Sequence, residues 1–174
     1  MRKPANGFTY FAKMQGGGAR APMPKTIHIF WSWCGGAVAI GLIAWIAQLV
    51  DQPLLAAPLG ASAVLAFGVP DSPLAQPRNI IGGHIVAAFA GIVFLKLLGN
   101  DWWVMGLSVA TAIAMMQFLR VVHPPAGANP LIVIMVGASW DYLLVPVAVS
   151  AFILSICAVF FNNLATARRY PLYW

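Results

Sequence analysis

The sequence predicts an all-α membrane protein with four long transmembrane helices and two short helices broken by proline and glycine. Hydrophobic residues make up 61% of the 174 residues, whereas charged residues make up only 8%. A soluble domain carries roughly a quarter charged residues, so this chain has too few charges to cover a water-facing surface. Long apolar segments recur along the chain, and prolines interrupt two shorter ones. We therefore expect a helical bundle that lies in a lipid bilayer.

The basic residues of the chain are unevenly distributed. Five of the ten lysines and arginines lie within residues 1–25, and the acidic residues are four aspartates with no glutamate. A basic segment directly before an apolar run is typical of the cytoplasmic side of a membrane, where it faces anionic lipid. We therefore expect residues 1–26 to form a basic cytoplasmic N-terminal tail, and we expect no nucleic acid partner.

The first apolar run covers residues 27–50, which carry no formal charge over 24 residues. This length is enough to cross a bilayer with some tilt. A secretory signal would place a short apolar core directly after the first basic residues, whereas this run starts further along the chain. We predict a retained transmembrane helix here.

The second apolar run, residues 54–69, is short and contains Pro58 and Gly60, and a polar loop with several prolines follows it. Proline and glycine at these positions predict a broken helix. The third run covers residues 80–98 and the fourth covers residues 102–119. Both are long enough to be predicted as transmembrane helices.

The fifth apolar run, residues 121–138, contains the sequence VHPPAGANP, with three prolines and one glycine. Proline removes a backbone donor and clashes with the preceding turn, so a helix cannot run through this sequence unbroken. Lipid cannot satisfy the freed N–H and C=O groups, so protein or water must cover the break. A sixth helix over residues 142–163 and a cytoplasmic C-terminal tail over residues 166–174 complete the prediction.

Small residues recur every fourth position in the third and fourth runs. They are Gly83, Ala87 and Gly91, and Gly106, Ala110 and Ala114. Such ridges let helices approach closely, either within one subunit or between subunits. Because a chain of 18.6 kDa makes a thin bundle, we expect a homo-oligomer.

The two broken runs resemble each other. Residues 58–62 (PLGAS) match residues 125–129 (PAGAN) at a constant offset of 67, with three of five positions identical. The long runs on either side fall into the same register, so residues 27–98 and 102–163 read as two units of three segments. Three crossings per unit is an odd number, so the two units would be inverted in the membrane. A broken segment at the corresponding place in each half is typical of a transporter binding site.

The distribution of charge favours six crossings. If all six segments cross, every lysine and arginine except Lys96 lies on the cytoplasmic side, with both termini. If the two broken segments only dip into the membrane and return, two basic residues lie outside. The positive-inside rule therefore favours six crossings over four.

The broken segments predict a binding site for an anion. Prolines suit the first turn of a helix, and the N–H groups near Gly60 and Gly127 would then point out of two helix ends with the positive dipole behind them. Such an end attracts an anion without a buried lysine or arginine. Ser62 and Asn129 would cap these helices or contact the ligand. The alternative is that both breaks are ordinary kinks with ordinary caps.

The positions of the ionisable residues limit which kinds of solute the predicted site could bind. No carboxylate lies well inside a segment, which argues against an Asp/Glu proton relay or a carboxylate cation site and agrees with an anion or a neutral solute. His123 is a candidate functional residue because it is an ionisable group inside a membrane segment. The alternative is that its side chain hydrogen-bonds to the backbone groups left unpaired beside the prolines. For His84, packing near Gly83 is favoured over ligand binding. Arg78 and Arg120 either set topology or concentrate anions at the mouth.

Three blocks of the sequence resemble the HPP family of small integral membrane proteins. They are VHPPAGA at residues 122–128, APLGASAVLAF at residues 57–67 and SPLAQPRNIIGGH at residues 72–84. The resemblance covers about residues 27–165. It implies a transporter or channel for a small inorganic anion with nitrite as the leading substrate, because plant chloroplast and cyanobacterial members are associated with nitrite transport. Function is largely unassigned for bacterial members, and family descriptions usually count four membrane spans.

We therefore predict an anion transporter or channel in a bacterial inner membrane, with no enzyme activity, cofactor or metal. The residues predicted to bind substrate are Pro58, Gly60, Ala61, Ser62, His123, Pro125, Gly127, Ala128 and Asn129, and those predicted to attract anions or support the site are Arg78, Asn79, His84 and Arg120. One rival is a structural or regulatory subunit that binds a partner helix. The other is a haem or metal protein, which the wide spacing of the three histidines disfavours.

Overall fold

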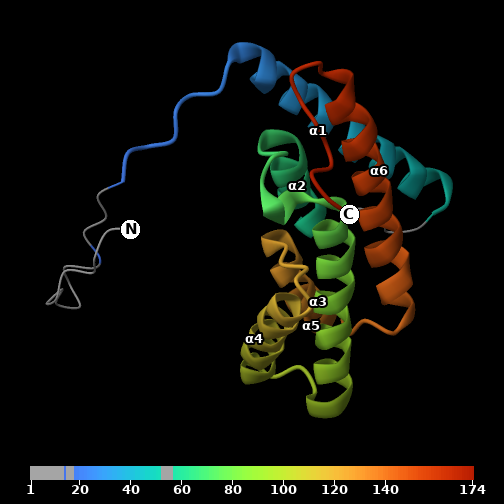
Figure 1. Ribbon diagram of the computed structural model, residues 1–174. Coiled ribbons are helices and arrows are strands. Elements are labelled where there is room, and N and C mark those ends of the chain that lie inside the picture. The colour runs from blue at the N-terminus through green and yellow to red at the C-terminus, as the bar shows by residue number, and fades with distance from the viewer. Residues whose placement is uncertain (1–13, 15–17, 52–56) are drawn as a thin grey trace, which may run out of the picture.

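The computed structural model describes residue 14 and residues 18–51 and 57–174 of the chain (Figure 1). Regular secondary structure in these residues is entirely helical. The longer helices are α1 (Thr26–Leu49), α3 (Pro77–Leu98), α4 (Trp102–Phe118) and α6 (Val149–Leu164). The shorter ones are α2 (Ala57–Ala63), a π-helical turn η2 (Val64–Gly68), a 3-10 turn η3 (Pro73–Ala75), a 3-10 turn η4 (Pro124–Ala128), α5 (Asn129–Val136) and a π-helical stretch η5 (Leu143–Ala148).

Three helices of the described residues are long and apolar enough to cross a membrane. They are Thr26–Leu49, Pro77–Leu98 and the run Leu143–Leu164, which joins η5 to α6. The fourth predicted span, α4, is shorter at 17 residues. The two segments predicted to be broken are short apolar helices, as expected. Most of the predicted N-terminal tail and the first residues of the second apolar run lie outside the described residues.

Helix α3 is central to the fold, with α4 and α5 on one side and α6 on the other (Figure 1). Its ridge of small residues makes this packing close. A Cβ atom added at Gly83 would lie 2.7 Å from the Cβ of His123, and one added at Gly91 would lie 2.7 Å from the Cα of Pro130. The close approach predicted for this ridge therefore exists, and the surface it meets is the broken fifth segment.

The ridge on α4 has a different environment. Gly106, Ala110 and Ala114 are all exposed, and a Cβ atom added at Gly106 would meet no atom within 4 Å. Helix α4 packs through its other face instead, which buries Val104, Ala112 and Met116.

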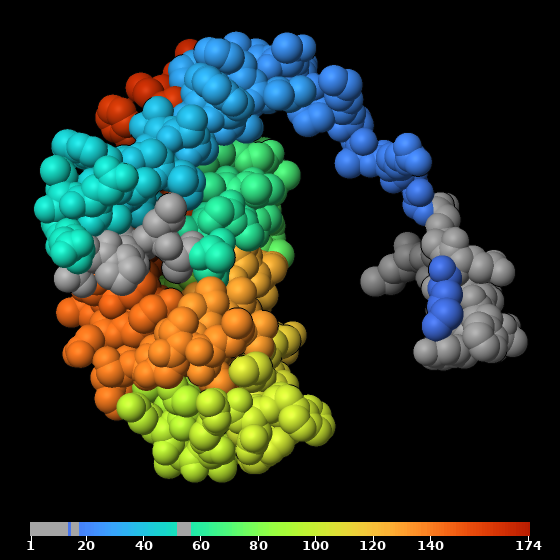
Figure 2. Space-filling view, turned by 180° about the vertical axis from the view of Figure 1, so that it is seen from behind, coloured from blue at the N-terminus to red at the C-terminus, as the bar shows by residue number. Residues whose placement is uncertain are grey.

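Helix α1 lies obliquely across one end of the molecule, opposite the turn between α3 and α4 (Figures 1 and 2). One face of α1 is buried, at Gly35, Ala39 and Ile43, and a side chain at Gly35 would collide with the ring of Phe67. Phe67 also packs edge-on against Phe161 of α6, with ring centroids 6.3 Å apart. The first apolar core therefore joins α1, the end of the second segment, and α6.

The sixth predicted helix is interrupted near its start. Pro146 cannot donate a backbone hydrogen bond, and the preceding Val145 leaves the helical region at φ −125° and ψ 118°. Regular α-helix begins only at Val149. The apolar run over residues 142–163 predicts one continuous helix, and Pro146 is the reason for the difference.

The predicted C-terminal tail packs against the protein. Tyr170 is only 2% exposed, and its hydroxyl donates to the backbone oxygen of Ala75 at 2.6 Å. The backbone N–H of Leu172 donates to Oε1 of Gln76 at 2.8 Å. Residues 170–173 therefore cover the loop that leads into α3.

Arg168 joins three parts of the chain that are far apart in sequence. Its guanidinium donates to the backbone oxygens of His28 at 2.7 Å and Phe67 at 3.2 Å, to Oδ1 of Asn162 at 2.8 Å, and to Oγ of Ser32 at 3.0 Å. Burial lowers the pKa of Arg168, and nearby Asp71 opposes this change. From sequence alone, Arg168 is expected only to set the topology through its charge on the cytoplasmic side.

We expect Arg168→Gln to lower the thermal unfolding midpoint in detergent micelles by several degrees, because glutamine cannot reach all four oxygens. A hydrogen bond to a charged group contributes about 1.5–3 kcal/mol, and here the partly exposed position reduces that value. Arg169→Gln is the matched control, since Arg169 is exposed. Equal midpoints for the two variants would contradict the bridging role of Arg168.

Candidate functional site

Four polar side chains from separate segments meet inside the protein. They are Ser62 of α2, His84 of α3, His123 just before η4, and Asn129 of α5, and each is at most 2% exposed. Burying a polar group costs free energy unless it is hydrogen-bonded. We call these four side chains the polar cluster. It lies where η4 and α5 pack on α3 and where α2 packs on η4.

Ser62 is the centre of the polar cluster. Its Oγ lies 2.8 Å from Nε2 of His84 and 2.8 Å from Nε2 of His123. The two imidazole rings are therefore neighbours, with centroids 5.2 Å apart and planes tilted by 54°. The outer nitrogens also have partners, since Nδ1 of His84 lies 2.9 Å from Nδ2 of Asn129, and Nδ1 of His123 lies 2.8 Å from the backbone oxygen of Leu74.

Local sequence explains how His123 reaches this position. The proline that follows it favours an extended backbone, and His123 has φ −138° and ψ 100°. Gly83 lacks a side chain, which lets His123 lie directly on α3. Nδ2 of Asn79 donates to the backbone oxygen of Val122 at 2.9 Å and so holds the preceding residue. The break at His123-Pro124-Pro125, here called the HPP segment, therefore places His123 against α3.

The amide of Asn129 determines the tautomer of His84. Nδ2 of Asn129 also lies 3.0 Å from the backbone oxygen of His84, and a carbonyl oxygen only accepts hydrogen bonds. The amide nitrogen must therefore face His84, and its second hydrogen points to Nδ1. Nδ1 accepts this bond, so the neutral ring carries its hydrogen on Nε2.

The same reasoning determines the tautomer of His123. The backbone oxygen of Leu74 accepts from Nδ1, so in the neutral ring Nε2 is an acceptor. Ser62 then accepts from Nε2 of His84 and donates to Nε2 of His123. The hydrogen bonds run in one direction, from Asn129 through His84, Ser62 and His123 to the carbonyl of Leu74.

The structure brings together only some of the predicted site residues. Ser62, His84, His123 and Asn129 form the polar cluster, with buried Pro58 and Asn79 beside it. The rest lie nearer the surface. Gly60, Ala61, Arg78 and Arg120 are exposed, and Pro125, Gly127 and Ala128 are partly buried.

The predicted capping role does not describe Ser62 or Asn129. Ser62 lies in the last turn of α2, where its Oγ is also 3.0 Å from the backbone oxygen of Pro58. Asn129 is the first residue of α5, and Ala128 precedes it as the capping residue without a side-chain hydrogen bond. Both side chains bind imidazole nitrogens instead.

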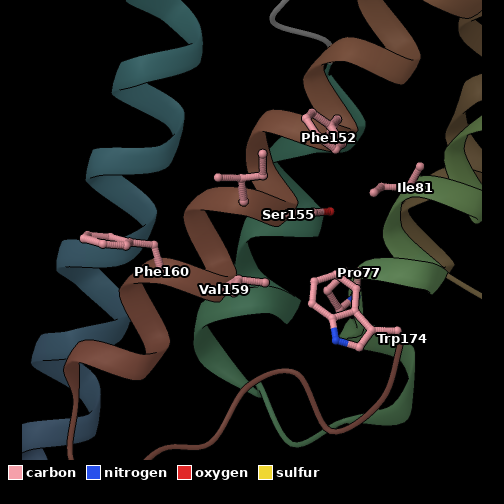
Figure 3. A pocket seen from close by; sticks show the side chains of 8 residues that line it. Pro77, Ile81, Phe152, Ser155, Val159, Phe160 and Trp174 are labelled. Carbon is pink, nitrogen blue, oxygen red and sulfur yellow. The ribbon is translucent and has the colours of Figure 1, made fainter.

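An apolar cavity of about 280 Å³ lies between α3 and α6, away from the polar cluster (Figure 3). Figure 3 shows Trp174 beside Pro77 at one end of it and Phe152 at the other. Its one hydroxyl, that of Ser155, donates to the backbone oxygen of Ala151 at 2.8 Å. The polar cluster, and not this cavity, therefore holds the groups able to recognise a polar solute.

Within the described residues, no three or more His, Cys, Asp or Glu side chains come together as a group able to hold a metal ion. Two of the histidines nevertheless meet, although 39 residues separate them. Sequence spacing gave no signal of this contact. It arises because Ser62, in the first half, joins both rings.

Comparisons with known proteins agree with the resemblance seen in the sequence. A family profile described as HPP, transmembrane region, matches residues 21–171. Two proteins of Dictyostelium discoideum, each named a transmembrane protein, are 39% and 36% identical over 95% of this chain. The chain spans 63% and 57% of the lengths of these relatives. No solved structure matches.

Proposed function

The chain belongs to the HPP transmembrane family, and we propose that it transports a small inorganic anion, with nitrite as the leading substrate, through the polar cluster. One observation carries the proposal. Two helices broken inside the apolar part of the chain bring buried hydrogen-bonding side chains to one place, although a membrane protein has little reason to bury them for packing alone.

The chemistry of the polar cluster suits an anion. Its hydrogen-bond donors are the Asn129 amide, Nε2–H of His84, the Ser62 hydroxyl and Nδ1–H of His123. The helices that supply Ser62, Asn129 and His84 contain no aspartate or glutamate, so no negative charge lies on them to repel an anion. An anion that replaces Ser62 as acceptor for His84 would keep that donor satisfied in a region where water is scarce.

The polar cluster also supports the inverted repeat. Ser62 and Asn129 occupy the same position in the two matching blocks, and they bind opposite nitrogens of one imidazole, that of His84. We infer that residues 27–98 and 102–163 are inverted repeats with both termini cytoplasmic, in a bacterial inner membrane.

A flux assay in proteoliposomes tests the function. Purified protein is reconstituted, and uptake of nitrite, nitrate, formate and chloride is measured against vesicles without protein. We expect saturable nitrite flux that depends on the protein. If none of the four anions crosses faster than in the empty vesicles, the proposed function is rejected.

We expect Gly127→Leu to reduce flux at least tenfold while the thermal unfolding midpoint stays the same. A Cβ atom at Gly127 meets no other atom within 4 Å, so the larger side chain would occupy open space beside the broken segment without displacing protein. Gly106→Leu is the matched control, since Gly106 has the same freedom on the exposed face of α4. Undiminished flux in Gly127→Leu would place the route elsewhere.

A further inference from the structure

The polar cluster has two complete hydrogen-bonding arrangements that differ by one proton. In the neutral arrangement, Ser62 donates to Nε2 of His123. If Nε2 of His123 gains a proton, it becomes a donor to Ser62, and the Ser62 hydroxyl can turn to the backbone oxygen of Pro58, 3.0 Å away. Ser62 then accepts from both histidines and donates once. Every polar atom keeps a partner, and no heavy atom has to move.

His84 has no such second arrangement. A proton on its Nδ1 would face Nδ2 of Asn129, and two donors would then oppose each other at 2.9 Å. Rotating the amide would not help, because its oxygen would then face the backbone oxygen of His84. The geometry therefore favours His123 over His84 as the place where a proton binds.

The described elements around the polar cluster provide no other proton site of this kind. Helices α2, α4 and α5 and the turns η3 and η4, which surround the polar cluster, carry no Asp, Glu, Lys, Arg, Cys or Tyr. Helix α3 adds only Arg78 and Lys96, both exposed. From the C-terminal segment, Tyr173 donates to Oδ1 of Asn79 at 2.9 Å, and burial raises the pKa of Tyr170, which keeps its proton. Imidazole is the side chain that changes charge between pH 5 and 8.

An anion at the polar cluster needs a positive partner. Moving an unpaired ion out of water into an apolar interior carries a large penalty, which a neighbouring opposite charge reduces. Among the residues that the structure describes around the polar cluster, only a histidine can supply that charge. We propose that His123 binds a proton and that one proton crosses with each anion, so that transport is electroneutral. This inference rests on the proposed anion transport.

Transport in proteoliposomes tests the coupling. Nitrite accumulation is measured with the outside more acidic by about one pH unit and the membrane potential clamped to zero with potassium and valinomycin. One proton per anion predicts accumulation of about tenfold at equilibrium, since one pH unit corresponds to a factor of ten. Empty vesicles measure the passage of nitrous acid through lipid. In His123→Gln we expect the protein-dependent part of this accumulation to be lost, whereas His28→Gln, which alters a histidine of α1 outside the polar cluster, should retain it.

Nitrogen-15 NMR of histidine-labelled protein in lipid vesicles tests the proton site without transport. We expect one cluster histidine to become doubly protonated as pH falls, and we expect its signals to be missing in His123→Gln. His84 should stay in the Nε2–H tautomer. Titration of His84 in place of His123, or of neither ring down to pH 5, would overturn the assignment.

The two experiments separate the two proposals. If no anion crosses at all, the transport function fails, and with it the coupling, while the NMR titration still decides whether His123 binds a proton. If nitrite crosses but a pH gradient drives accumulation no faster than in empty vesicles, the function stands and the coupling is overturned.

Discussion

Replacing Ser62 with alanine is expected to destabilise the protein more than any other single loss of a side-chain hydroxyl that the structure describes. The change leaves Nε2–H of His84 without an acceptor and Nε2 of His123 without a donor. Each buried group left unsatisfied costs about 1–3 kcal/mol, and two groups are affected. Because this hydroxyl joins α2 to His84 of α3 and to His123, we also expect anion flux to be lost.

Ser155→Ala provides a matched control for this result. Ser155 is a buried helical serine whose Oγ donates to a carbonyl one turn earlier, as Ser62 lies one turn after Pro58. Removing that hydroxyl leaves no imidazole nitrogen without a hydrogen-bond partner. Thermal unfolding of both variants in detergent micelles measures the difference. If Ser62→Ala unfolds at the temperature of Ser155→Ala, the polar cluster does not hold the broken segments together.

Gly83→Leu is the second change with a large expected effect. Even a single Cβ atom at this position would lie 2.7 Å from the Cβ of His123 and 3.0 Å from the backbone oxygen of Val121. These atoms belong to or adjoin the backbone and cannot turn aside, so the HPP segment must move away from α3. Inserting excess volume into a packed interior typically costs about 1–3 kcal/mol, and here the movement also separates His123 from Ser62.

The expected result of Gly83→Leu is a lower unfolding midpoint together with loss of flux. Gly106→Leu, on the exposed ridge of α4, adds the same side chain where no atom lies within 4 Å and should keep the wild-type midpoint. A Gly83→Leu protein as stable as Gly106→Leu would show that the contact between α3 and the HPP segment is not tight in the membrane.

Much of the fold follows from local chemistry that a sequence displays. Proline suits the first turn of a helix and disrupts its interior, so the breaks near Pro58 and Pro124 were predictable, and both segments are short helices in the structure. The match between residues 58–62 and 125–129 also singled out Ser62 and Asn129 before any contact was visible. A ridge of small residues predicted close packing on α3.

Other features depend on contacts between distant parts of the chain. The sequence analysis favoured a packing role for His84, because nothing in its neighbourhood indicates that Ser62 and Asn129 lie on either side of its ring. Gly60 and Gly127 were predicted to mark the centre of the site, but it is the polar side chains a few residues beyond them that reach α3. Periodicity places a residue on a helix face and leaves open which helix it meets.

The contacts of Arg168 have a consequence for the order in which the chain can be assembled during synthesis. The carbonyl of His28 lies 140 residues earlier in the chain than this guanidinium, and that of Phe67 lies 101 residues earlier. The ribosome must therefore release all the helices before these carbonyls can bind Arg168. The contacts that Arg168 makes with α1 can therefore form only after residue 168 has been translated.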